Sequence, residues 1–205
     1  MNLTVSKRDL LKLATRATAI AEKKSTMPAL ALCLLEARGG RLSCSATDMF
    51  CALVDSVAAD VTAEGSLAVN PKDLADRLKN LPDGPVTLVT KDGALTLRSK
   101  SSARRYTMRG LNGEDYPPLP KVDASAPTIS LGQGILSELI AHTAFAVSTD
   151  DTRAHLSSVL VEMGGGTVRM VATDGHRLAK TEKTIEGGAS ATMLIPRKAI
   201  GELRL

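Results

Sequence analysis

An internal repeat at an offset of 126 residues is the feature that most constrains the fold of this chain. The stretch LLEARGGRLSCSATD (34–48) aligns without a gap with LVEMGGGTVRMVATD (160–174), and both stretches end in Ala-Thr-Asp. The match extends toward the N-terminus, where Leu10 aligns with Leu136 and apolar residues align with apolar residues. Self-similarity at a fixed period indicates tandem copies of one structural unit.

The repeat also predicts the domain organisation. With one residue removed, 69–80 aligns with 194–205, whereas the second copy has no counterpart of 81–124. We therefore expect a complete first module over residues 1–124 and a truncated second module over residues 125–205. On this basis the chain is interpreted as a fragment or a truncated gene product.

Within one unit, two helices are predicted. The first covers about 7–21, because Ser6 followed three residues later by Asp9 has the pattern of an N-cap and apolar residues then recur at helical spacing. The apolar stripe of this helix consists of Leu10, Leu13, Ala14 and Ala17. The second helix covers 71–80, where Asn70-Pro71 places a proline at or near the first helical position.

Strands are predicted in the rest of the unit. Gly39-Gly40 and Asp92-Gly93 lie between apolar runs and predict hairpin turns. The expected strands cover 1–5, 29–37, 41–48, 51–61, 65–69, 86–100 (as a hairpin) and 103–111, and a proline-rich linker covers 112–127. This order predicts an α+β fold of tandem modules, each with two helices packed on antiparallel β-sheet.

Composition narrows the classes of function. The 205 residues include no Trp, two Phe and two Tyr, so the core must be aliphatic and recognition of bases by aromatic stacking is disfavoured. The net charge of +4 permits an anionic partner. No apolar run is long enough to span a membrane and no signal-peptide core is present, so we expect a cytoplasmic protein without a membrane partner.

Neither the cysteines nor the histidines have the spacing of metal ligands. Cys33, Cys44 and Cys51 lie in apolar segments and are expected to be buried free thiols. The three histidines, His142, His155 and His176, show no metal-ligand spacing. We therefore predict no metal site and no cofactor, and the chain also lacks a P-loop for ATP.

The polar cluster Thr173-Asp174-Gly175-His176-Arg177 raises three alternatives: an active site, a binding site or a turn. In an active site, His176 would be a general base oriented by Asp174. The two residues are only two positions apart, a turn would not fix their geometry, and the sequence has no nucleophile motif such as Gly-x-Ser-x-Gly. A catalytic site also needs a third member, so we predict no catalytic residues and no enzyme.

Long stretches of the chain resemble the bacterial sliding clamp, the beta subunit of DNA polymerase III. They include TMPALALCLLEA (26–37), RRYTMRGLNGEDYPPLP (104–120), FAVSTDDTRAHLSSVLVE (145–162) and ATDGHRLA (172–179). The resemblance implies a ring of six modules, three in each subunit of a homodimer, with helices lining the hole. It also implies three partners: double-stranded DNA bound without sequence preference, DNA polymerase III, and an ATP-driven clamp loader.

Basic residues on the helices are the expected DNA contacts. Arg8, Lys12 and Arg16 recur every four residues on one face of the first predicted helix, where they would attract phosphates without reading sequence. Lys72 and Arg77 add charge on the second predicted helix. The resemblance adds Lys23 and Lys24, and the repeat adds Arg197 and Lys198. For any single residue, the alternative is an ordinary solvated charge.

The resemblance assigns the polar cluster to a pocket that receives a short apolar peptide from polymerases and other partners. The expected pocket residues are Arg153, Leu156, Thr173, Gly175, His176, Arg177 and Leu178. The leucines would bury an apolar anchor, the arginines would donate hydrogen bonds to the peptide, and the glycine would permit a sharp turn. The first copy has Met49 and Phe50 at the glycine and histidine positions, so we expect a pocket only in the second copy.

Two functions remain open for the chain. One is a sliding-clamp subunit that encircles DNA and tethers the polymerase, present as a fragment that alone neither closes a ring nor binds a peptide tightly. The other is a truncated, clamp-derived module that binds polymerase peptides without encircling DNA. The stretch LSSVL (156–160) departs from the Leu-Asn-Gly that is more usual in the clamps, so the sequence does not predict the shape of this loop.

Overall fold

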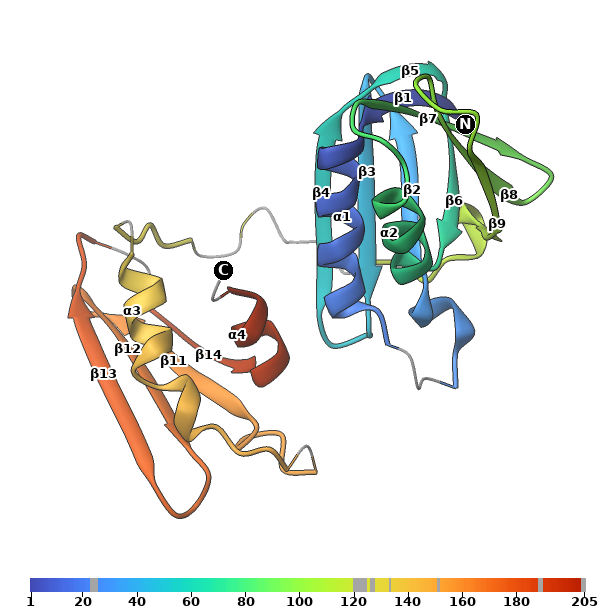
Figure 1. The fold of residues 1–205 in the computed structure, drawn as a ribbon. Helices are drawn as coiled ribbons and strands as arrows, with labels where there is room; N and C mark the ends of the chain where they lie inside the picture. The colour runs from blue at the N-terminus through green and yellow to red at the C-terminus, as the bar shows by residue number, and fades with distance from the viewer. Residues whose placement is uncertain are drawn as a thin grey trace. The chain divides into compact units, whose positions relative to one another are not determined.

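The computed structural model describes residues 1–22, 26–119, 125, 128–132, 134–150, 152–187 and 190–203. The chain divides into two compact units, Met1–Pro120 (unit 1) and Lys121–Leu205 (unit 2), and each is described by itself (Figure 1). None of the helices in the described part of the chain is long and apolar enough to cross a membrane.

The described residues of unit 1 form two α-helices and two antiparallel sheets. The helices α1 (Lys7–Ile20) and α2 (Pro71–Lys79) pack side by side, with α1 against the second sheet (Figure 1). The first sheet has the strand order β5-β1-β7-β8-β9, and the second has the order β10-β6-β2-β3-β4. The strands are β1 (Asn2–Ser6), β2 (Cys33–Arg38), β3 (Arg41–Thr47), β4 (Ala52–Ala58), β5 (Asp60–Ala63), β6 (Gly65–Val69), β7 (Pro85–Lys91), β8 (Ala94–Ser99), β9 (Arg105–Arg109) and β10 (Leu111–Asn112). Two short 3₁₀ helices are η1 (Pro28–Ala31) and η2 (Gly113–Asp115).

The two helices begin in different ways. Asn70 caps α2 as its side chain accepts a hydrogen bond from the Asp73 amide at 3.0 Å, with Pro71 at the first helical position. Ser6 occupies the predicted N-cap position of α1 and Asp9 lies in the first turn, but the Ser6 side chain makes no capping hydrogen bond. Ser6 is also the last residue of β1, where it pairs with Pro85. Its backbone is therefore set by the sheet.

The core of unit 1 is aliphatic, as predicted. The predicted stripe of α1 is confirmed, and the buried residues of this helix are Leu10, Leu13, Ala14, Ala17 and Ile20. They pack in one cluster with buried side chains from both sheets and from α2. Burial of such apolar area is the main stabilising term for a unit of this size.

The turns largely follow the predictions. Gly39 and Gly40 have φ values of +56° and +74°, and Asp92 and Gly93 have φ values of +49° and +70°, as type I′ hairpin turns require. The predicted strand over 29–37 starts late, because η1 occupies its first residues and β2 begins only at Cys33. The cause is local: Pro28 fixes its own φ and starts a 3₁₀ turn.

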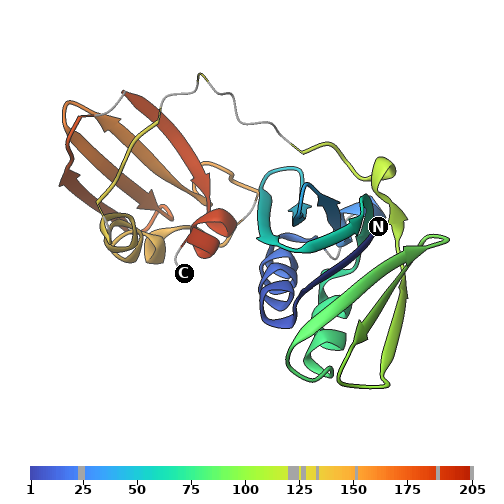
Figure 2. The same ribbon diagram turned by 90° about the horizontal axis from the view of Figure 1, so that it is seen from above.

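The described strands of unit 2 form an antiparallel sheet with the order β13-β12-β11-β14. Its strands are β11 (Ser158–Gly164), β12 (Thr167–Thr173), β13 (Leu178–Thr184) and β14 (Ala191–Pro196). Figure 2 shows α3 (Ile135–Ala141) and α4 (Arg197–Leu203) on the same face of this sheet. The short η3 (Ala144–Ala146) follows α3, and the unit has its own buried cluster.

The repeat is visible in the backbone. Strands β12 and β13 lie 126 residues after β3 and β4 at both ends. The pairing Cys33–Val69 of β2 and β6 recurs as Val159–Ile195 of β11 and β14, again at 126. The start of α4 follows the start of α2 by the same offset, so the removal of one residue before this helix, predicted from sequence, is wrong.

The two copies differ most near their N-terminal ends. Residues 128–132, the counterpart of β1, form no strand. Helix α3 has 7 residues, whereas α1 has 14. The part of the module that the two copies share most closely is therefore the sheet, including the hairpin of β3 and β4 in unit 1 and of β12 and β13 in unit 2. Five of the seven candidate pocket residues lie in or beside the second of these hairpins, at 173–178.

Candidate functional site

The loop between β12 and β13 is a hydrogen-bonded turn. Thr173 Oγ1 accepts a hydrogen bond from the Gly175 amide (3.1 Å) and donates one to the Arg177 carbonyl (2.8 Å). Asp174 Oδ1 accepts hydrogen bonds from the amides of His176 and Arg177, each at 3.0 Å. Gly175 has a φ of +91°, in a region that glycine enters without strain. The Thr-Asp pair and the glycine thus set the backbone of this loop.

The equivalent loop of unit 1, between β3 and β4, has the same network. Thr47 Oγ1 accepts from the Met49 amide (3.0 Å) and donates to the Cys51 carbonyl (2.9 Å). Asp48 Oδ1 accepts from the amides of Phe50 (3.0 Å) and Cys51 (2.7 Å). Met49 takes the positive φ, +75°. The repeated Thr-Asp pair therefore has an architectural role in both units.

The hydrogen bonds of Asp174 argue against a catalytic pair with His176. The backbone amides of His176 and Arg177, and then the Arg177 side chain, lower the pKa of Asp174 to about 2. Asp174 Oδ2 accepts from Arg177 Nε at 2.9 Å, so both carboxylate oxygens are engaged in the turn. The His176 side chain is exposed. This arrangement supports the interpretation of the cluster as a turn that displays side chains.

Arg177 has a second partner, Phe145, which the sequence analysis missed. One terminal nitrogen of Arg177 donates to the Phe145 carbonyl at 2.7 Å, and its guanidinium carbon lies 5.8 Å from the centre of the Phe145 ring. Phe145 lies in η3 and is 59% exposed. In the sequence, Phe145 stands out only because phenylalanine is rare: the chain has two.

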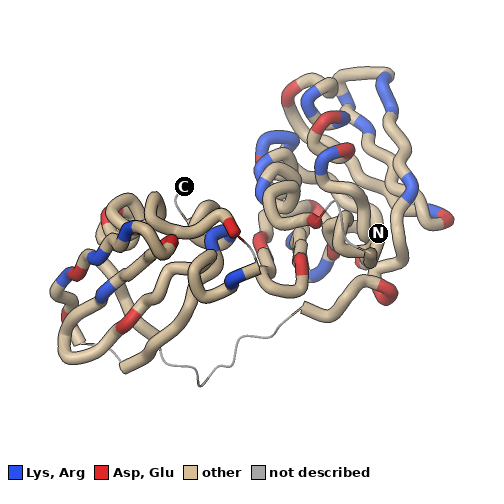
Figure 3. The backbone as a smooth tube through the Cα atoms, turned by 90° about the horizontal axis from the view of Figure 1, so that it is seen from below, with Lys and Arg blue, Asp and Glu red and all other residues tan. Residues whose placement is uncertain are grey.

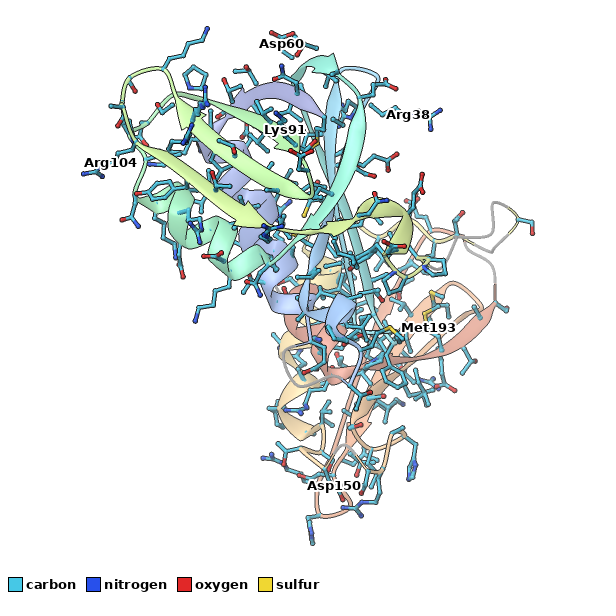
Figure 4. All side chains as sticks on the ribbon, turned by 90° about the vertical axis from the view of Figure 1, so that its right-hand side faces the viewer. Arg38, Asp60, Lys91, Arg104, Asp150 and Met193 are labelled. Atoms are coloured by element: carbon cyan, nitrogen blue, oxygen red, sulfur yellow. The ribbon has the colours of Figure 1, made fainter. Side chains whose placement is uncertain are left out.

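Arg153 and Leu156 lie in the loop that leads into β11. Arg153 Nε donates to Asp150 Oδ2 at 2.9 Å, and Asp150 lies at one end of unit 2 (Figure 4). The Leu156 amide donates to the Arg153 carbonyl (2.9 Å), and the Leu156 carbonyl accepts from the Ser148 amide (2.9 Å). The Leu156 side chain is half-buried. These bonds give the loop a defined shape that the LSSVL stretch did not predict.

The sheet topology places the two loops at the same end of unit 2. Neighbouring strands of the sheet are antiparallel, so one end of the sheet carries the start of β11, the end of β12, the start of β13 and the end of β14. Thr173 pairs with Leu178 there, and Leu178 is 66% exposed. This end therefore combines exposed apolar surface with two arginines, each oriented by an acid three residues earlier.

The predicted DNA-binding residues on α1 share an exposed face. Arg8, Lys12 and Arg16 are all exposed on the side opposite the buried stripe. Arg16 also forms an ion pair with Asp55 of β4. Figure 3 shows basic residues along the helices of unit 1 as well as on its strands. Arg8 and Lys12 are thus the simplest candidates for contacts with phosphates.

The two candidates on α2 differ from each other. Lys72 is exposed in the first turn of the helix. Arg77 makes two hydrogen bonds to Asp73, at 2.9 and 3.0 Å, and its guanidinium carbon lies 6.0 Å from the centre of the Tyr106 ring. A phosphate would therefore have to compete with these internal contacts of Arg77.

The remaining candidates for DNA contacts lie on α4 or outside the described residues. Arg197 is exposed and Lys198 is half-buried in the first turn of α4. Lys198 is the counterpart of Lys72 at the offset of 126. Lys23 and Lys24 lie outside the residues that the structure describes.

None of the three cysteines, all of which the structure describes, forms a disulfide, and two of them are buried. Cys33 and Cys44 are buried, and the hydrogen bond between their side chains, followed by desolvation, raises the pKa of the Cys33 thiol. Cys51 is half-buried, so the prediction of burial is wrong for this residue, which lies in the exposed β3–β4 turn. Among the described residues, no group of three or more His, Cys, Asp or Glu side chains could hold a metal ion.

The two units place the chain in the class of proteins built from repeated α+β modules with antiparallel sheets. Residues 1–120 match the family model for the N-terminal domain of the DNA polymerase III beta subunit, and residues 130–205 match that for its central domain. The chain belongs to the DNA polymerase III beta subunit family.

Individual relatives agree with this assignment. The chain is 34% identical over 206 residues to the beta sliding clamp of Pseudomonas aeruginosa. This alignment covers 99% of this chain and 56% of the relative. It is 34% identical over 211 residues to the beta sliding clamp of Caulobacter vibrioides, covering 100% of this chain and 56% of that relative. The chain thus spans just over half the length of these relatives.

Solved structures show the same fold. A sliding clamp from Pseudomonas aeruginosa bound to griselimycin matches with a TM-score of 0.91 and 32% identity, over 100% of this chain and 56% of that one. A sliding clamp from Bacillus subtilis matches with a TM-score of 0.92 over the same shares of the two chains. Its identity is 24%, so this match supports the fold alone.

Proposed function

We propose that the chain is part of a DNA sliding clamp, a non-catalytic cytoplasmic processivity factor. Residues 1–124 and 125–205 would be two of its modules, and the full-length protein would act as a homodimer that a clamp loader places around duplex DNA. It would then tether DNA polymerase III. The observation that carries this proposal is the family match, which covers residues 1–120 and 130–205.

The exposed face of α1 is suited to hold DNA loosely. Arg8 and Lys12 project from one side of a helix whose other side is buried in the core of unit 1. Such cations attract phosphates without making contacts to bases, so the protein can slide. The other proposed contacts are Arg16, Lys23, Lys24, Lys72, Arg77, Arg197 and Lys198.

The same end of unit 2 that carries Leu178 would receive a partner peptide. Leu156 and Leu178 would take an apolar side chain, and Arg153 and Arg177 would donate to peptide carbonyls or carboxylates. The proposed peptide-binding surface also includes Thr173, Gly175 and His176. Griselimycin, the peptide ligand in the structure of a related clamp, is the natural probe for this surface.

The test of the DNA-binding face is the salt dependence of binding to a duplex by the full 205-residue chain. The double variant Arg8→Ala/Lys12→Ala should reduce the slope of log K against log salt by about 1.8, because each lost phosphate contact removes about 0.9. The matched control Lys91→Ala/Arg98→Ala removes the same charge from exposed strand positions, with Lys91 visible in Figure 4.

The control variant shows whether DNA binding depends on the position of the charges on α1 or only on the net charge of the chain. We expect the control variant to retain most of the wild-type slope. An equal reduction in both variants would show that only net charge matters and would contradict the proposed face. Binding of griselimycin without any binding of duplex DNA would favour the alternative, a clamp-derived peptide-binding module.

A further inference from the structure

We propose that Phe145 is a positioning residue for the peptide-binding surface, through its contacts with Arg177. This inference rests on the proposed pocket of unit 2 and adds to it a residue outside the two loops that the resemblance indicated. Phe145 lies in η3, 32 residues before Arg177 in the sequence.

Three contacts fix the Arg177 side chain. Its Nε donates to Asp174 Oδ2 at 2.9 Å, and a terminal nitrogen donates to the Phe145 carbonyl at 2.7 Å. The Phe145 ring lies 5.8 Å from the guanidinium carbon, within the range of a cation–π interaction. The Asp174 carboxylate thus holds Nε, and the Phe145 carbonyl holds a terminal nitrogen of the same guanidinium.

The turn itself does not need this arrangement. At the offset of 126, Phe145 aligns with Ala19 and Arg177 aligns with Cys51. The turn of unit 1 nevertheless has the same hydrogen bonds and the same positive φ at its second loop position. The Phe–Arg pair is therefore an addition to a turn that folds without it, which points to a role in binding.

The consequence is a pre-oriented donor beside an exposed leucine. Two of the five N–H groups of Arg177 are used in the bonds to Asp174 and Phe145, and three remain to be offered to a ligand. An arginine that is already fixed loses less side-chain entropy when it binds a carbonyl or carboxylate. Leu178, the next residue, is 66% exposed and offers the apolar part of the contact.

The experiment measures griselimycin binding by Phe145→Ala, Phe145→Tyr and wild-type chains, by calorimetry on the full 205 residues. Loss of the ring should weaken binding about three-fold, the size expected when one arginine side chain has to be ordered on binding. Tyrosine keeps the ring and should restore wild-type affinity. The matched control is Phe50→Ala, which removes the other phenylalanine, 90% exposed in the equivalent turn of unit 1, and should leave affinity unchanged.

A second readout separates positioning from folding. The Arg177 Nε–H signal in NMR spectra should lose its ring-current shift in Phe145→Ala, while its hydrogen bond to Asp174 and the amide signals of His176 and Arg177 stay in place. If Phe145→Ala keeps wild-type affinity and an unchanged Arg177 signal, or if Phe50→Ala weakens binding equally, the inference is wrong. If the wild-type chain does not bind griselimycin at all, the proposed pocket fails, and this inference fails with it.

Discussion

The two Thr-Asp turns of the molecule have one backbone and different side chains. In both turns a threonine hydroxyl and an aspartate carboxylate satisfy the loop amides, and the second loop position has a positive φ. The side chains that follow are Met49, Phe50 and Cys51 in unit 1 but Gly175, His176 and Arg177 in unit 2. Only the second set includes a cation and an imidazole.

This difference separates architecture from function. The residues that the two copies share, Thr and Asp, are the ones that build the turn. Of the residues that differ, Met49, Phe50, Gly175, His176 and Arg177 are exposed, and Cys51 is half-buried. In a repeated module, divergence between copies at exposed positions therefore indicates a binding surface more directly than identity does.

The largest expected effect concerns the helices that support the turns. Leu10→Ala should destabilise unit 1 by about 2–5 kcal/mol, because Leu10 is fully buried and its loss leaves a cavity. Its counterpart Leu136 is half-buried, so Leu136→Ala should destabilise unit 2 by less than about 2 kcal/mol. Urea unfolding, followed through NMR signals of each unit, measures both values. Equal losses would show that α3 supports its unit as α1 does.

The next effect tests the shared backbone of the turns. Gly175→Met should destabilise unit 2 by about 1 kcal/mol, because an L-residue is strained at the φ of +91°. Met49→Gly should stabilise unit 1 by about 0.5 kcal/mol, since it relieves strain at +75° but adds freedom to the unfolded chain. Thermal unfolding of the two variants measures both changes. Changes of the same sign would contradict the equivalence of the two turns.

A smaller effect is expected in acid. The folded-state pKa of Asp174 is about 2, below its ordinary value of 3.8, so its contribution is fully present above about pH 4. That contribution should be lost as the pH falls from about 4 to about 2. Asp174→Asn should remove this part of the pH dependence of unit 2, which melting curves at several pH values would detect. An identical pH profile for wild type and variant would show that the turn does not depend on the ionised carboxylate.

The smallest expected effect is chemical and leaves stability unchanged. Cys51, which occupies the Arg177 position, is half-buried, whereas Cys33 and Cys44 are buried and the pKa of Cys33 is raised. A thiol reagent at neutral pH should therefore modify Cys51 first and the other two only on unfolding. Mass spectrometry of peptides from the labelled chain shows the order. Early labelling of Cys33 would mean that the sheet of unit 1 opens locally.

Much of the fold follows from sequence patterns that act over short distances. The helical stripe beginning at Leu10 and the hairpin turn at Gly39 were predictable because each depends on neighbouring residues. The late start of β2 was not, because Pro28 forms a 3₁₀ turn within an apolar run that has strand-like composition.

The limits for the candidate site have the same origin. The resemblance supplied the residues of the turn, but Phe145 was missed because its contact with Arg177 spans 32 residues and has no counterpart in unit 1. The internal bonds of Arg77 to Asp73 illustrate a related limit, since helical spacing predicts which residues share a face but not whether a cation is already engaged.

We propose that the two Thr-Asp turns share one backbone conformation, but that only the turn of unit 2 belongs to a peptide-binding surface. Titration of the isotope-labelled 205-residue chain with griselimycin, followed by amide chemical shifts, tests it directly. We predict shifts at residues 153–156 and 173–178 and unchanged signals at residues 47–52. Shifts of similar size in both turns, or shifts confined to unit 1, would contradict the claim.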